Sequence, residues 1–164
     1  MKKYLMLALG LAVLAGATGG AAGRSADAAE LIPVQLLCID AQGGSIRLTT
    51  DTGDIGSGKS MEAAFADLKA GCAGQLFTQT AEHVVLTRRA WYLAPQVCVS
   101  GQLRPAAHIY RVEQAPGELA ALLAFLQAHP GQMTLSRMRA LLLRGEQAEP
   151  AQVRRTEGGF RLGA

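Results

Sequence analysis

The sequence predicts an α+β fold, with one domain in which a mixed or antiparallel sheet begins with a β-hairpin and packs against three to four helices. Two strand-like segments follow one another before any helical pattern appears. Later strands and helices occur in the order β-β-α-β-(α)-β-α-α-β, which lacks the regular alternation of βαβ units. About 135 residues follow an export-like segment, enough for one hydrophobic core.

The first residues have the pattern of a secretory signal peptide. Lys2 and Lys3 give a positive start, and the apolar run Tyr4–Ala15 follows. Small residues come next, with triplets suited to cleavage at 15–17 and 26–28. Because the apolar run is shorter than the roughly 20 residues of a membrane-spanning helix, we expect cleavage and export. An uncleaved membrane anchor is the alternative.

These features predict a signal peptide and lead-in over residues 1–28 and one domain over 29–164. The chain has a formal net charge of +3, and removal of the two signal lysines leaves the domain almost neutral. It has no Lys/Arg cluster and no aromatic interleaving, so we expect no nucleic-acid partner. We expect no lipid anchor, because Ala17 stands where a lipoprotein has cysteine.

The domain is predicted to begin with two strands joined by a turn. Val34–Asp40 is apolar on both faces, and Ser45–Thr50 alternates apolar and polar residues. Asp51–Gly58 is rich in Gly and Asp, which predicts a loop. Ser60 is then a suitable N-cap. The helix that follows is expected to end at Gly71 or Gly74, and its apolar residues recur at helical spacing: Met61, Ala64, Phe65, Leu68 and Cys72.

Shorter strands and two helices are predicted in the second half. The expected strands are Leu76–Thr78, His83–Thr87, Ala106–Val112 and a closing hairpin of 152–155 with 159–162. Arg89–Val99 is ambiguous, because Pro95 disfavours a long helix. One helix carries Leu119, Leu122, Leu123 and Leu126 and stops at 129–131. Thr134 caps the other, whose arginines we expect to form a solvated face; contact with anionic lipid or a partner is the alternative.

Residues Gly53–Ser60 match the P-loop pattern G-x-x-x-x-G-K-[ST]. A phosphate-binding P-loop follows a buried parallel strand, whereas residues 49–52 are polar and end a hairpin strand. The aspartate that would hold Mg²⁺ should follow later, and Asp67, on the helix, is the only aspartate that does. We therefore interpret the match as a loop followed by a helix start. The alternative is nucleotide or anion binding, with Gly58, Lys59 and Ser60 at the helix N-terminus.

No catalytic, metal or cofactor site is predicted. Cys38 lies in an apolar run and reads as a buried side chain, whereas Cys72 and Cys98 lie near predicted element ends and are the pair we expect to form any disulfide. The histidines, His83, His108 and His129, are scattered and do not form a zinc pattern with the cysteines. Carboxylates cannot be paired, and no nucleophile has a recognisable partner.

Several segments, in order, resemble the N-terminal domain of the Ger(x)C family, the C-type subunit of spore germinant receptors. They cover about residues 33–162 and are Leu36–Asp40, Gly58–Ala64, Gln75–Phe77 with His83–Leu86, Leu103–Tyr110, Thr134–Leu142 and Gly158–Leu162. Cys38 departs from the family's Gly-Ile-Asp pattern, and Ala17 replaces the family's lipid-bearing cysteine. The resemblance implies a non-enzymatic, exported, spore-associated binding or assembly module, with protein partners at the outer face of the membrane or in the spore envelope.

Overall fold

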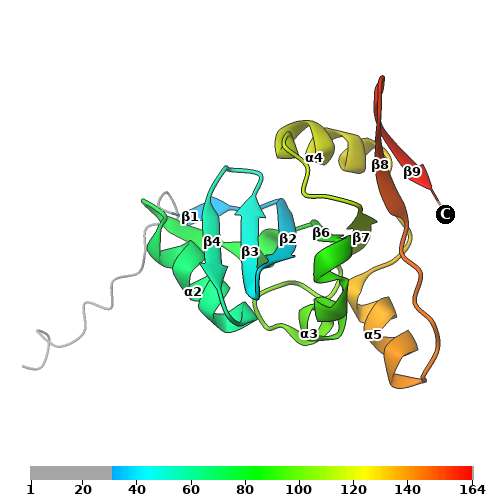
Figure 1. Ribbon diagram of the computed structural model, residues 1–164, viewed down its shortest axis with the longest axis horizontal. Helices are drawn as coiled ribbons and strands as arrows, with labels where there is room; N and C mark the ends of the chain where they lie inside the picture. The colour runs from blue at the N-terminus through cyan, green and yellow to red at the C-terminus, as the bar shows by residue number, and fades with distance from the viewer. Residues whose placement is uncertain (1–30, 164) are drawn as a thin grey trace, which may run out of the picture. The chain divides into compact units, whose positions relative to one another are not determined.

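A mixed sheet of seven strands forms the centre of the structure, a computed structural model that describes residues 31–163 (Figure 1). Its strand order is β4-β3-β2-β6-β7-β8-β9. These strands are β2 (Leu36–Gln42), β3 (Ser45–Thr50), β4 (Ile55–Gly58), β6 (His83–Thr87), β7 (His108–Val112), β8 (Gln152–Thr156) and β9 (Gly159–Gly163). Strands β2, β6, β7 and β8 run parallel, whereas β3, β4 and β9 run antiparallel to their neighbours. The predicted α+β class, with a mixed sheet that starts with a hairpin, is confirmed.

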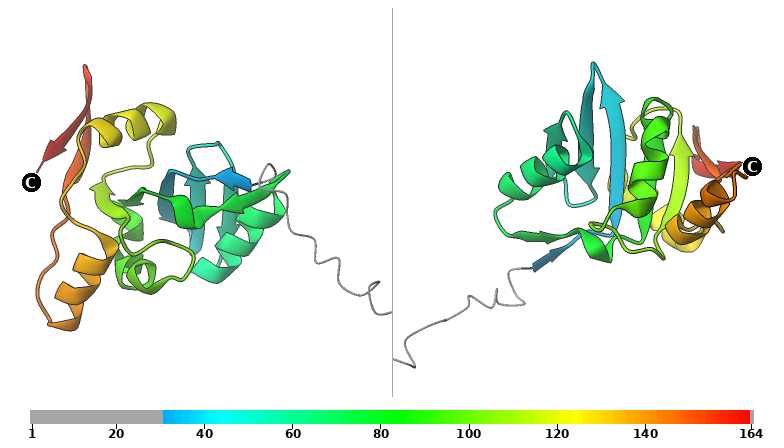
Figure 2. Two further views of the ribbon diagram at one scale, coloured as in Figure 1. Left: turned by 180° about the vertical axis from the view of Figure 1, so that it is seen from behind. Right: turned by 90° about the horizontal axis from the view of Figure 1, so that it is seen from below.

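Helices cover both faces of this sheet (Figures 1 and 2). The helices are α2 (Met61–Ala70), α3 (Ala94–Val99), α4 (Leu119–Ala128) and α5 (Leu135–Leu143). Residues of α2, α3 and α5 share the larger core cluster with strand residues such as Leu37 and Ile39. Helix α4 instead packs with the C-terminal strands in a second cluster that includes Leu36 and Tyr110. The sheet therefore separates two cores.

Smaller elements connect the layers. Strands β1 (Leu31–Pro33) and β5 (Gln75–Phe77) form a parallel pair of their own. Two 3₁₀ helices, η2 (Thr78–Thr80) and η3 (Arg88–Leu93), precede β6 and α3 respectively. The ambiguous stretch after Arg88 is thus two short helices in succession. Pro95 lies in the first turn of α3, where a missing backbone N–H costs nothing.

The predicted helix caps are confirmed. The side chain of Ser60 accepts a hydrogen bond from the Ala63 amide at 3.2 Å, and Thr134 accepts one from the Arg137 amide at 3.2 Å. Each hydroxyl pairs an amide that has no partner inside its helix. Glu62 lies in the first turn of α2, where its charge complements the helix dipole.

The predictions missed two strands, β4 and β1. Residues 55–58 were expected in a loop, but they form edge strand β4, antiparallel to β3. Strand β1 was also missed, because its three residues carry no alternation long enough to read. The predicted signal segment, residues 1–28, lies outside the described residues, so its assignment stays a prediction.

Candidate functional site

The P-loop-like segment is built for helix packing. Strand β4 lies directly against α2, and a Cβ added at Gly56 would lie 2.5 Å from the Ala64 carbonyl oxygen. A Cβ at Gly58 would lie 2.5 Å from the Ala64 amide nitrogen. Real Cβ atoms do not approach backbone this closely, so only glycine fits at both positions. The two glycines of the motif therefore set the distance between the strand and the helix.

Two backbone amides at the β4–α2 junction, those of Ser57 and Ala63, are already paired. The Ser57 amide donates to Asp67 Oδ2 at 2.7 Å, and Ser60 Oγ holds the Ala63 amide. Gly58 lies opposite Ile46 in the ladder, and Lys59 is exposed. A phosphate cradle needs several free amides pointing at one anion, and here a carboxylate lies among them. The structure thus brings Gly58, Lys59 and Ser60 together without forming such a cradle.

Two of the histidines predicted to be scattered are neighbours. Parallel pairing of β6 and β7 sets His83 opposite His108, and the two rings stack with centroids 5.8 Å apart. Tyr110 lies 5.8 Å from the His83 ring. His129 lies elsewhere, stacked on Phe125. His83 begins one predicted strand and His108 lies near the start of another, Ala106–Val112, but nothing in the sequence indicated that these two strands pair.

Hydrogen bonds link this cluster to the 129–134 connection. The Gly131 amide donates to the Tyr110 hydroxyl at 2.9 Å, and the same hydroxyl is hydrogen-bonded to His83 Nδ1 at 3.2 Å, with the His83 tautomer deciding which of the two atoms donates. Burial, and then the nearby His108, lower the pKa of His83. Burial also raises the pKa of Tyr110, against the opposite effect of the Gly131 hydrogen bond. His83 is therefore held neutral inside the sheet.

The two histidines do not extend into a metal centre. Within residues 31–163, no group of three His, Cys, Asp or Glu side chains is placed to hold a metal ion. His108 Nδ1 and Arg104 Nε are buried without a hydrogen-bond partner. The stacked histidines join β6 to β7, and the Tyr110–Gly131 hydrogen bond joins β7 to the 129–134 connection. The cluster thus has a structural role.

Asp40 forms a second polar cluster at the carboxyl ends of β2 and β6. It accepts hydrogen bonds from Thr87 Oγ1 at 2.6 Å and from Arg89 Nη2 at 2.9 Å. Thr87 also accepts a bond from the Ala90 amide and so caps η3. Both carboxylate oxygens of Asp40 are thus paired within the fold, and the cluster anchors η3 to the sheet.

The three cysteines are free thiols, so the predicted Cys72–Cys98 disulfide is not formed in the structure. Cys98 lines a hollow with Leu103 and Arg139, and Cys72 is not among the residues of that hollow. Burial, and then Asp40, raise the pKa of Cys38 to about 12. Burial raises the pKa of Cys98 to about 11, with Arg139 acting in the opposite sense. Both thiols are protonated at neutral pH, and a protonated thiol is a poor nucleophile.

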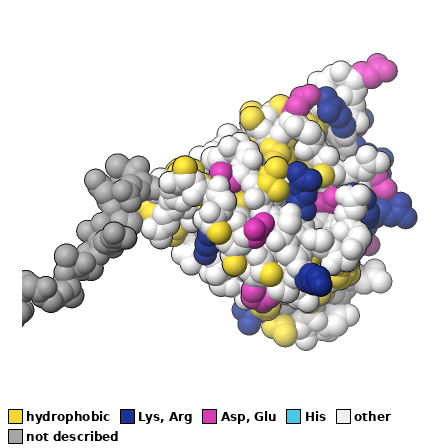
Figure 3. All heavy atoms as spheres, turned by 60° about the vertical axis from the view of Figure 1, so that its left-hand side comes forward, with side chains coloured by type: hydrophobic (Ala, Val, Ile, Leu, Met, Phe, Trp, Pro, Cys, Tyr) yellow, Lys and Arg dark blue, Asp and Glu magenta, His cyan; other side chains and the backbone are white. Residues whose placement is uncertain are grey.

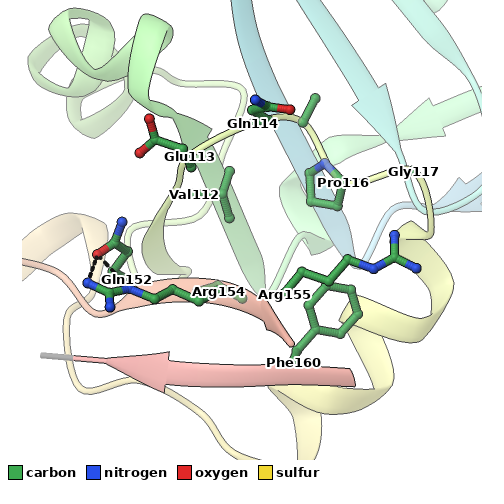
Figure 4. Close-up of a pocket in the computed structure, with 11 residues that line it drawn as sticks. Val112, Glu113, Gln114, Pro116, Gly117, Gln152, Arg154, Arg155 and Phe160 are labelled. Carbon is green, nitrogen blue, oxygen red and sulfur yellow. Dashed lines mark hydrogen bonds between the residues drawn. The ribbon is translucent and has the colours of Figure 1, made fainter. Parts of the chain in front are cut away.

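A groove with a volume of about 660 Å³ lies where β7 ends (Figure 4). One wall is the connection from β7 to α4, and the other is β8 with Phe160 from β9. Its lining residues are Val112, Glu113, Gln114, Ala115, Pro116, Gly117, Gln152, Val153, Arg154, Arg155 and Phe160. The groove was not predicted from the sequence. It exists because β8 extends beyond the end of β7, and no local sequence pattern determines that difference in length.

Two arginines, Arg154 and Arg155, line the groove. After Thr87 the chain has arginines but no lysines, and the arginines outnumber the carboxylates there. In the face drawn in Figure 3, charges of both signs are interspersed, with Lys and Arg mainly on the right of the view. In the groove itself, Glu113 pairs with Arg88 and Arg155 pairs with Glu118. Arg154 is held by Gln152 Oε1 at 2.9 and 3.2 Å.

No family model, curated protein or solved structure matches this chain. Among the helices of residues 31–163, none has the length and apolar character that crossing a bilayer requires.

Proposed function

We propose that this protein is a non-enzymatic, exported binding or assembly module associated with sporulation or spore germination, similar to the N-terminal domain of the germinant-receptor C subunit. The observation that carries the proposal is the use of the P-loop-like segment as a strand-to-helix packing site. Gly56 and Gly58 admit α2, and Asp67 pairs an amide that phosphate would need. This accounts for the motif without a nucleotide.

The positions of the resembling segments add support. Leu36–Asp40 lies in β2, Gly58–Ala64 spans the start of α2, and His83–Leu86 lies in β6. Of the later segments, Leu103–Tyr110 reaches β7 only at residues 108–110, Thr134–Leu142 lies on α5 and its cap, and Gly158–Leu162 lies on β9. The resembling segments thus lie mainly on regular elements of the domain.

Deletion of the gene in a spore-forming host that encodes it tests the biological role. We expect slower germination with nutrient germinants, measured by the fall in optical density of a spore suspension, and rescue by the wild-type gene. Fractionation should place the mature protein outside the cytoplasm, with an N-terminus between Ala17 and Glu30. A cytoplasmic protein that starts at Met1, with unchanged germination, would contradict the proposal.

The alternative function, nucleotide or anion binding through Gly53–Ser60, has a direct test. We expect no Mg²⁺-dependent binding of ATP in a calorimetric titration, because the Ser57 and Ala63 amides are already paired. Lys59→Ala should give the same baseline as wild type. ATP binding that requires Mg²⁺ and disappears in Lys59→Ala would establish the alternative.

A further inference from the structure

The groove lies beside β8, at the position that β7 would occupy if it continued beyond Val112. Strand β8 pairs with β7 through only two residue pairs, Arg111 with Gln152 and Val112 with Val153. Strand β7 then ends, and the chain turns away through residues 113–117 toward α4. Strand β8 continues to Thr156, supported from its other side by β9. The groove lies between the departing chain and this continuation (Figure 4).

The continuation of β8 has open hydrogen-bonding groups on the groove side. The Arg111 amide donates to the Ala151 carbonyl, so residues 151 and 153 direct their backbone groups toward β7. Backbone direction alternates along a strand. The N–H and C=O of Arg155 therefore point to the same side, beyond the last residue of β7. An extended segment placed there would pair with them as a prolonged β7.

The two sides of this strand position differ in chemistry. Antiparallel pairing sets Arg155 opposite Phe160 and Arg154 opposite Arg161, so these pairs face opposite sides of the sheet. Phe160 packs against the second core cluster, and with Pro116 it gives an apolar side. Arg154 and Arg161 give a basic side. Since neighbouring residues of an added strand face opposite sides, an alternation of apolar and acidic residues would suit both.

The charged side chains of the groove favour an acidic occupant. Glu113, the carboxylate among the lining residues, pairs with Arg88, and the lining residue Arg155 pairs with Glu118. Among residues 31–163, no carboxylate lies within 4.0 Å of the Arg154 guanidinium, which is held by the neutral Gln152 amide. An arginine in this state retains its capacity for a two-point bond to a carboxylate.

We propose that this groove binds an extended segment of a partner protein in which apolar and acidic residues alternate. The segment adds to the groove side of β8, places a carboxylate against Arg154 and places an apolar side chain against Phe160 and Pro116. The inference rests on the proposed function as a binding module and names the class of partner. Strand addition is an established mode of peptide recognition, in which backbone bonds give affinity and side-chain pockets give specificity.

The test uses the full chain and a fluorescein-labelled peptide with the core Val-Glu-Val-Glu-Val, followed by fluorescence anisotropy. We expect saturable binding and, because a charged hydrogen bond is lost, about tenfold weaker binding to Arg154→Gln. A peptide with glutamine in place of glutamate should weaken binding similarly for wild type and change little for Arg154→Gln. Arg137→Gln, on the exposed side of α5, is the matched control and should bind as wild type.

A second variant tests the location independently of charge. A Cβ at Gly117 meets no atom within 4 Å, so Gly117→Leu should fold, as checked by circular dichroism, and should obstruct the groove. We expect binding to be abolished in this variant. No binding to the wild type, or equal binding to wild type, Arg154→Gln and Gly117→Leu, would overturn the inference. That result concerns the groove alone, since fractionation and germination decide the proposed function.

Discussion

Gly56→Ala is expected to lower the free energy of unfolding by about 3 kcal/mol, the upper end of the range for overpacking a well-packed site. The new methyl group would lie 2.5 Å from the Ala64 carbonyl oxygen and equally close to the Leu68 Cα atom. These neighbours are backbone atoms of α2, which cannot move aside as a flexible side chain would. Relief requires a shift of the whole helix away from β4. Urea denaturation followed by circular dichroism measures the loss.

The matched control is Gly101→Ala. A Cβ at Gly101 meets nothing within 4 Å, so its stability should lie within about 0.5 kcal/mol of wild type, as for ordinary surface substitutions. Gly58→Ala should behave like Gly56→Ala, because its Cβ would lie 2.5 Å from the Ala64 amide nitrogen. If Gly56→Ala were as stable as Gly101→Ala, the packing explanation of the P-loop-like segment would be wrong.

Tyr110→Phe is expected to cost about 2 kcal/mol, because it leaves two polar groups without their partner. The Gly131 amide loses its acceptor, and the buried His83 Nδ1 loses its hydrogen-bond partner. Ring packing should survive the change, since phenylalanine keeps the contacts of the aromatic ring. The expected loss therefore reports the hydrogen bonds and not a cavity. Chemical denaturation at pH 8, where His83 is neutral, gives the measurement.

Tyr92→Phe removes the same hydroxyl from a side chain that is 67% exposed. Water replaces any partner at such a site, so this variant should match wild type within about 0.5 kcal/mol. Equal stability of the two tyrosine variants would show that the hydroxyl of Tyr110 contributes no more than a solvated one. The link from β7 to the 129–134 connection would then depend on packing alone.

Local signals were the predictable part of this fold. The hairpin of β2 and β3 follows from alternation and a Gly-Gly turn, and both glycines have positive φ angles. Ser60 and Thr134 were identifiable as caps because a cap depends only on the next three residues. Strand β4, in contrast, depends on a contact between distant parts of the fold. Two glycines in four residues disfavour a strand. Close packing of α2 makes them necessary, and sequence patterns do not encode that contact.

The same limit applies to the candidate sites. His83 and His108 lie on strands that are separated in the sequence by η3 and α3, and only the parallel pairing of β6 with β7 stacks their rings. The groove depends on the difference between the end of β7 and the end of β8, which no single segment determines. The chemistry of individual residues could be judged from sequence, including the interpretation of Cys38 as a buried side chain.

The sheet order also has a consequence for the order of assembly. Strand β2 pairs with β3 through a short turn. Its other neighbour, β6, is separated from it in the sequence by elements that include α2 and β5. Closing that long loop costs chain entropy before any contact repays it. Until β6 arrives, the most apolar strand of the domain has an unpaired edge. An unpaired apolar strand edge favours aggregation, so we expect early closure of the β2–β6 pair to protect this chain.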